Sequence, residues 1–261
     1  MTATSRQTTA PTGALLACVD RSRYASAVCD YAAWFSGRTQ SPIVLVNVEE
    51  PGKPGPEKTS EASPVIRARE RLEHEGAEAI TALEPAGRFA RTLIDLSASA
   101  ELILMGKRGR EADDRSALGS NVEPVVRGTT RPICLVSQVF LPISRALIIL
   151  DADPLHKRAV NFVSAHPALR GLEMDLVLMD DGRPEAAGKL TWAREKLRPH
   201  SAGVFAMSAA TPAAAVRAYR RNGGFDLLII SREVALADKS ASLKQIDPQS
   251  IWAQRAPVLI C

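Results

Sequence analysis

The sequence passes twice through the same alternation of short apolar runs and helical segments, and this repeat constrains the fold more than any other feature. The apolar runs of the first pass occupy residues 14–19, 43–48, 77–83, 102–105 and 132–136, and those of the second occupy residues 146–150, 174–179, 203–207, 227–230 and 257–260. Continuous apolar strands that alternate with helices are typical of parallel sheets covered on both faces. We therefore predict an α/β protein of two tandem doubly wound domains, each with a five-stranded, mainly parallel sheet.

The matching ends of the two passes set the predicted domain limits. Each first strand ends in an aspartate, Asp20 or Asp151, and each last strand starts at a proline, Pro132 or Pro257. A length of 261 residues accommodates two ordinary domains. We predict a flexible tail at residues 1–12, a first domain at 13–138, a linker at 139–142 and a second domain at 143–261.

Composition and charge argue against several classes of protein. No run of 18 apolar residues is present, as a membrane span would require, and the Thr/Ser-rich start does not look like a secretory signal. Lys+Arg and Asp+Glu number 17 and 17 up to Val139 and 16 and 12 after it, so neither half has the strongly basic character of a nucleic-acid-binding surface. Cys18, Cys134 and Cys261 lie inside apolar runs, which favours buried, reduced thiols and a cytoplasmic location.

A glycine pattern follows the fourth apolar run of the first pass. Gly106, Gly109, Gly119 and Ser120 have the spacing G-x2-G-x9-G-[ST]. Glycines at the carboxyl end of a buried strand let backbone N–H groups approach an anion closely. We expect a helix to begin at Ser120, whose hydroxyl would cap the helix and could add a donor to the same anion. The pattern predicts a phosphate cradle.

Charged residues near this pattern permit two interpretations. Lys107, Arg108 and Arg110 could contact phosphate, or they could form a solvated loop, since the three carboxylates between residues 111 and 114 nearly cancel their charge. Asp20 could touch a ligand, or it could simply begin the helix that follows the first strand. The glycine pattern nearby favours the ligand-binding interpretation for Asp20.

The second half departs from the pattern. Ser231 stands where the first glycine should be, and no glycine occurs from Phe225 to Cys261. Without glycines the backbone cannot approach a polyphosphate in the same way. We also expect Asp153 and Pro154 to cap a helix after the strand that ends at Asp151. The second half is therefore predicted to bind no nucleotide and to act as a tethered structural partner.

These motifs give the sequence a resemblance to the universal stress proteins in their tandem-domain form. The resemblance covers nearly the whole chain and rests on the strand that ends in Asp20, the run 102–106, the glycine spacing and the closing strands. It implies a nucleotide, ATP or another adenine nucleotide, in the crevice beyond the strand ends, where open α/β sheets bind ligands. Mg²⁺ could accompany the phosphates; no protein metal site is expected.

The resemblance also implies which residues hold the nucleotide. Cys18, Asp20 and Val48 are expected to flank the adenosine. The residues expected on the phosphate side are Met105, Gly106, Arg108, Gly109, Gly119, Ser120, Asn121 and Val122.

Three functions remain open at this point. No lysine-containing phosphate motif, kinase-like residue set or water-positioning histidine is recognisable, so no catalytic residue is predicted. The preferred interpretation is a cytoplasmic nucleotide-binding sensor or regulator in a stress response. The alternatives are a slow ATP hydrolase or phosphotransferase, and a ligand-free dimerising scaffold in which the glycines serve only the loop.

The last strands of the two halves predict the assembly. They are apolar, and exposed strands of this kind pair readily with another edge. The resemblance implies pairing through this strand, and in a tandem chain the two copies can meet within one molecule. We expect an intramolecular pseudo-dimer with these strands adjacent and allow for a further homodimer through another face.

Overall fold

The computed structural model describes residues 10–51, 63–109, 118–180, 182–200, 202–220, 223–237 and 250–261. The strands of the first half are β1 (Leu15–Cys18), β2 (Ile43–Val46), β3 (Ile80–Leu83), β4 (Leu102–Gly106) and β5 (Ile133–Val136). Those of the second half are β6 (Arg145–Leu150), β7 (Glu173–Asp180), β8 (Gly203–Ser208), β9 (Leu227–Ile230) and β10 (Val258–Ile260). The strands match the predicted runs to within a few residues.

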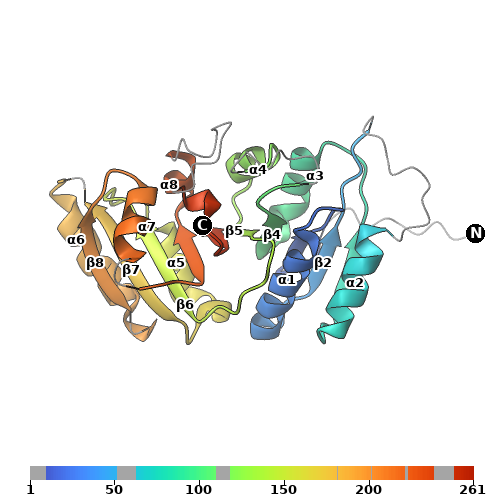
Figure 1. Ribbon diagram of the computed structural model, residues 1–261, viewed down its shortest axis with the longest axis horizontal. Coiled ribbons are helices and arrows are strands. Elements are labelled where there is room, and N and C mark those ends of the chain that lie inside the picture. The colour runs from blue at the N-terminus through green and yellow to red at the C-terminus, as the bar shows by residue number, and fades with distance from the viewer. Residues whose placement is uncertain are drawn as a thin grey trace, which may run out of the picture.

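All of these strands belong to one continuous sheet, in the order β3-β2-β1-β4-β5-β10-β9-β6-β7-β8 (Figure 1). Within each half every strand pair is parallel. The halves join where β5 pairs antiparallel with β10, with Cys134 opposite Leu259. The two tandem five-stranded halves are as predicted, and the expectation that their last strands lie side by side agrees with this pairing.

Helices cover both faces of the sheet. One face carries α1 (Ala25–Thr39), α2 (Pro64–His74), α5 (Arg158–Ala165) and α6 (Glu185–Lys196). The other carries α3 (Phe89–Leu96), α4 (Val122–Gly128), α7 (Pro212–Arg220) and α8 (Arg232–Ala237). Apolar residues on successive strand positions alternate between the two faces, as strand geometry requires.

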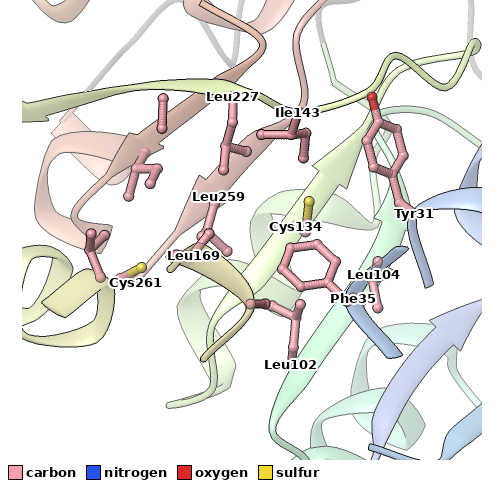
Figure 2. Close-up of a cluster of buried hydrophobic side chains, with 14 of the residues drawn as sticks. Tyr31, Phe35, Leu102, Leu104, Cys134, Ile143, Leu169, Leu227, Leu259 and Cys261 are labelled. Carbon is pink, nitrogen blue, oxygen red and sulfur yellow. The ribbon is translucent and has the colours of Figure 1, made fainter. Parts of the chain in front are cut away.

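Each of the two cores runs across the join between the halves. Figure 2 shows one of them, in which Phe35 of α1 and Cys134 of β5 lie in the same buried cluster as Leu259 of β10. Leu169 of the short 3-10 helix η2 (Pro167–Leu169) also belongs to this cluster, although it comes from the second half. Since a shared core excludes water from both halves at once, their stabilities are coupled.

Polar contacts join the halves at the edge of the sheet where β4 begins. Arg38 Nε donates to the carbonyl of Ala168 over 2.6 Å. His166 Nε2 lies 2.8 Å from the carboxylate of Glu101, just before β4. Burial acts to raise the pKa of Glu101, but the adjacent His166 ring and the Ser41 hydroxyl outweigh it, so the pKa is lowered and the carboxylate is charged at neutral pH.

Local sequence explains where some helices begin. Ser63 Oγ accepts from the backbone N–H of Val65, and Pro64 opens α2, as the Ser-Pro sequence predicts. The expected helix after Asp153 is wrong at its start. Asp153 Oδ1 accepts from the N–H of Leu155 over 2.9 Å in a local turn, and α5 begins only at Arg158.

One helix was not predicted. α8 follows β9 almost at once, and Ser231 Oγ accepts from the N–H of Val234 over 3.2 Å at its start.

The four buried cysteines are free thiols, in agreement with the prediction for Cys18, Cys134 and Cys261. In the described part of the chain, no helix combines the length and the apolar character of a membrane span.

Candidate functional site

Asp20 follows β1 at the carboxyl edge of the sheet. The backbone N–H of Val19 still donates to Val46 of β2, so the chain stays in the sheet up to that point. Asp20 Oδ1 then accepts from the N–H of Ser22 over 2.9 Å, which turns the chain toward α1. Part of the carboxylate's role is thus to shape this turn, and the Asp20 side chain remains half-buried rather than enclosed in the core.

The glycine loop, defined here as residues 106–120, leaves β4 and returns to the same place. Gly106 is the last residue of β4 and pairs with Val136. The N–H of Gly119 donates to the carbonyl of Lys107 over 2.8 Å, and the N–H of Val122 donates to Gly119. The two ends of the loop are therefore fixed against each other, while residues 110–117, with Arg110, lie outside the described residues.

Each glycine of the loop meets a different neighbour. A Cβ at Gly106 would lie 2.7 Å from the Cβ of Tyr24, and one at Gly119 would lie 3.2 Å from Arg108 Cα. A Cβ at Gly109 would lie 3.4 Å from Asp20 Oδ2, an ordinary contact distance. Packing therefore disfavours a side chain at Gly106 strongly and at Gly119 to a smaller degree. Gly109 is the glycine whose absent side chain is least explained by the protein itself.

These contacts bring Asp20 and the three glycines together beyond the carboxyl ends of β1 and β4. β1 and β4 are neighbours, although β2 follows β1 in the chain, so the strand order reverses at this point. Open α/β sheets bind ligands at such a point, because the loops on either side diverge there. Asp20 and the glycines, which the sequence assigns to one site, therefore lie close together, and ligand binding there stays a prediction.

Arg108 supplies a cation with an unused donor. Its Nε is buried and has no hydrogen-bond partner among the described residues, and its Cα borders Gly119. An unpaired buried N–H is costly and normally finds an acceptor. A guanidinium beside exposed backbone is well suited to a phosphate oxygen. An anion beside Arg108 would provide an acceptor for this N–H.

Lys107 is neither a phosphate-facing cation nor a solvated loop residue, so both interpretations offered for it are wrong. Its side chain is only 4% exposed, and Nζ donates to the carbonyls of Gln254 and Ala256 in the second half over 2.7 and 2.9 Å. Nζ also lies 3.2 Å from Ser137 Oγ. Burial lowers the pKa of Lys107 to about 7. The two carbonyl oxygens and the Ser137 hydroxyl around Nζ can accept hydrogen bonds from the ammonium, which favours the charged form.

The apolar members of the predicted set form the base of this region. Cys18, Met105 and Val122 are buried in the core beneath α3 and α4, and Val48 is half-buried against the same core. Burial, and secondarily the charge of Asp20, raises the pKa of Cys18, so its thiol is neutral. These residues can offer apolar contact to a ligand but no charge.

Ser120 does not cap the next helix. α4 begins at Val122, the residue in the cap position is Asn121, and no side chain there accepts from the helix backbone. Ser120 lies in a turn and is exposed. The helix starts later than expected because the N–H of Val122 bonds to Gly119, which forms a turn first.

The equivalent place in the second half is occupied by the protein's own side chains. Asp151 follows β6 as Asp20 follows β1, and its carboxylate lies 3.0 Å from Lys189 Nζ and 2.7 Å from His156 Nδ1. Lys189 Nζ also donates to the carbonyls of Asp151 and Asp153 over 2.7 and 2.5 Å. The lysine side chain is fully buried.

Lys189 was not singled out from the sequence, although a signal was present. It lies on the apolar face of α6 between two buried alanines, Ala186 and Ala193. In α2 the buried positions of the same spacing hold Val65, Ala68 and Leu72. A lysine in place of an alanine on a core-facing stripe indicates a buried partner, because a buried charge is paired in folded proteins.

The comparisons with known proteins bear on the first half. The sequence profile of the universal stress protein family matches residues 12–137. Residues 12–137 therefore form a domain of the universal stress protein family. A curated universal stress protein of Synechocystis, Slr1230, is 25% identical over 133 residues, which cover 50% of this chain and 46% of the relative.

Some solved structures extend the similarity in fold to both halves of the chain. A universal stress protein of Archaeoglobus fulgidus aligns over 95% of each chain with a TM-score of 0.67 and 19% identity, which shows a common fold. A universal stress protein solved in complex with cAMP aligns over 49% of this chain and 98% of its own, with 17% identity and a TM-score of 0.40.

Proposed function

We propose that the first half of this chain binds an adenine nucleotide, ATP or a close relative, with its phosphates on the glycine loop. The observation that carries the proposal is Arg108, whose buried Nε has no acceptor among the described residues. It borders Gly119, and Gly109 brings bare backbone close to Asp20. An anionic ligand would supply the acceptor that Arg108 lacks.

The residues of the site would divide the work by their chemistry. Asp20 can accept hydrogen bonds from ribose hydroxyls, and Cys18 and Val48 offer apolar surface to the adenine. Backbone N–H groups of the loop, the Arg108 guanidinium and the polar side chains of Ser120 and Asn121 suit the phosphates. The carbon-rich surfaces of Met105 and Val122 support the loop from below. Mg²⁺, if bound, would be held by phosphate oxygens.

The same proposal assigns a binding function rather than catalysis. His156 and His166 belong to the second half, where His156 lies against Asp151, and His166 contacts Glu101 of the first half. His74 lies on the exposed side of α2. This supports a nucleotide-dependent sensor or regulator in a stress response over a hydrolase or phosphotransferase.

The second half is proposed to bind no nucleotide. Lys189 and His156 already satisfy the Asp151 carboxylate. Ser231 takes the place of the first glycine and leads directly into α8, so no glycine loop follows β9 there. The division into domains at 13–138 and 143–261 and their assembly as an intramolecular pseudo-dimer belong to this proposal, and the β5–β10 pairing supports it.

A direct test is the identity of any small molecule that leaves the purified protein. We expect denaturation of the freshly purified chain to release an adenine nucleotide, detected by mass spectrometry, in at most one equivalent per chain. A chain that carries none and binds none of ATP, ADP, AMP or cAMP in solution would instead support the ligand-free scaffold. Turnover of ATP well above that of a Gly109→Val variant would support a hydrolase.

A further inference from the structure

The registers of the sheet relate the two halves residue by residue. In the first half Leu104 of β4 pairs with Cys134 of β5. In the second half Ile229 of β9 pairs with Leu259 of β10. Cys134 and Leu259 face each other across the antiparallel join. Leu104 and Ile229 therefore occupy equivalent places on either side of it.

Three residues beyond Leu104, Lys107 crosses the join. Its ammonium donates to the carbonyls of Gln254 and Ala256, in the segment that precedes β10. These acceptors lie five and three residues before Leu259. The side chain is buried, so the contacts are shielded from water.

Three residues beyond Ile229, Arg232 crosses in the opposite direction. Its guanidinium donates to the carbonyls of Thr129 and Arg131, in the segment that precedes β5, with 3.0 Å to Arg131. It also donates to Val126 at the end of α4 over 2.6 Å. Thr129 and Arg131 lie five and three residues before Cys134, so the two cations make equivalent contacts in reciprocal directions.

The backbone groups of Lys107 and Arg232 form different hydrogen bonds. The carbonyl of Lys107 accepts from the N–H of Gly119, which closes the glycine loop, and the next residue is Arg108. The N–H of Arg232 instead donates to Cys261, and Arg232 opens α8. The first cation is thus part of the loop that it anchors, whereas the second anchors a helix.

We propose that Lys107 is a positioning residue through which the second half holds the two ends of the glycine loop, residues 106–109 and 118–120, in the position that binds the nucleotide. This inference rests on the proposed nucleotide site in the first half. It gives a role to the second half, for which no nucleotide site is proposed. The backbone carbonyl of Lys107 binds Gly119 and so holds the base of the loop. Its ammonium binds the carbonyls of residues 254 and 256 and so connects the loop to the second half. Nucleotide affinity in the first half then depends on a contact with the second.

The test compares Lys107→Met with Arg232→Met, a matched control that removes the equivalent crossing cation without touching the loop. Both variants are expected to melt at a lower temperature than the parent. Only Lys107→Met should also weaken ATP binding in calorimetry, by about fivefold or more, within the usual range for coupled sites. Lys107→Arg should recover most of the affinity, since Arg232 shows that a guanidinium can make this contact.

A second readout requires no ligand. In hydrogen exchange on the parent and variant chains, Lys107→Met should speed amide exchange at residues 107–109 and 118–122, and Arg232→Met should not. If Lys107→Met fails to fold, Ser137→Ala, which removes one oxygen beside Nζ, should show a smaller effect at the same amides.

The outcomes separate this inference from the proposed function. If the parent binds no adenine nucleotide, the proposed function fails, and hydrogen exchange still decides whether Lys107 positions the loop. Unchanged loop exchange in a folded Lys107→Met variant would overturn the positioning role. Equal losses of ATP affinity in Lys107→Met and Arg232→Met would overturn it as well, because a merely structural role of the join predicts that result.

Discussion

Replacing Gly109 by valine is expected to lower the affinity for an adenine nucleotide at least tenfold, about 1.4 kcal/mol, while the chain stays folded. Gly109 is exposed, and a Cβ there meets Asp20 at an ordinary 3.4 Å. The branched side chain would therefore cost the free protein little. It would occupy the space in which phosphate oxygens need to approach bare backbone. Isothermal titration calorimetry with ATP measures the change.

The matched control is Gly37→Val, because Gly37 is an exposed glycine of the same half with no atoms near its absent side chain. This variant should bind as the parent does. Gly119→Val is less informative, since its Cβ would press against Arg108 Cα at 3.2 Å and disturb the loop itself. A folded Gly109→Val chain with the affinity of the parent would show that the glycines serve only the loop.

The second large effect concerns the join between the halves. Leu259→Asp is expected to reduce the free energy of unfolding by about 4 kcal/mol or more, because it removes a buried leucine and introduces an unpaired charge. Leu259 is fully buried opposite Cys134, in the core that both halves share. A domain has only about 5–15 kcal/mol of stability, so this loss should move the unfolding transition to a clearly lower urea concentration. Urea unfolding followed by circular dichroism measures this loss.

Phe205→Asp provides the comparison for this variant. Phe205 is 49% exposed on β8, at the outer edge of the sheet, so its replacement should change stability far less. If Leu259→Asp melts like Phe205→Asp, the two halves do not depend on the β5–β10 join. The shared core would then contribute little to the stability of the chain.

The sequence predicts the architecture well because the fold depends on patterns that are local. Apolar runs mark the buried parallel strands, and the Ser63-Pro64 pair marks the start of α2. The glycine spacing after β4 marks a loop whose two ends lie together, where the N–H of Gly119 donates to Lys107, whereas its use as a phosphate cradle stays a prediction. Each of these features is decided by residues close together in the chain.

The features that sequence reasoning missed depend on distant partners. Lys107 looks like one of three loop cations, and only the fold brings it to the carbonyls of Gln254 and Ala256. Lys189 contacts Asp151, from which it is separated by 38 positions in the chain. α8 is short and begins where the first half has its glycine loop, so the sequence there suggests a loop. The hydrogen bond from the N–H of Val234 to Ser231 Oγ, which starts the helix, is visible only in the structure.

Some expectations of the sequence remain predictions, because they concern the cell or other molecules. A cytoplasmic location, a role in a stress response, the absence of nucleic-acid binding and a further homodimer belong to this group. The proposed nucleotide site does not depend on these expectations. It depends on a difference between the two halves: the first has a glycine loop beside Asp20, and in the second Lys189 forms an ion pair with Asp151.

Calorimetric titration of ligand-free protein with ATP tests this difference most directly. A single site per chain is expected, with an affinity at least tenfold lower in the Gly109→Val variant. Two equivalent sites per chain, or a single site of unchanged affinity in a folded Gly109→Val variant, would contradict this expectation.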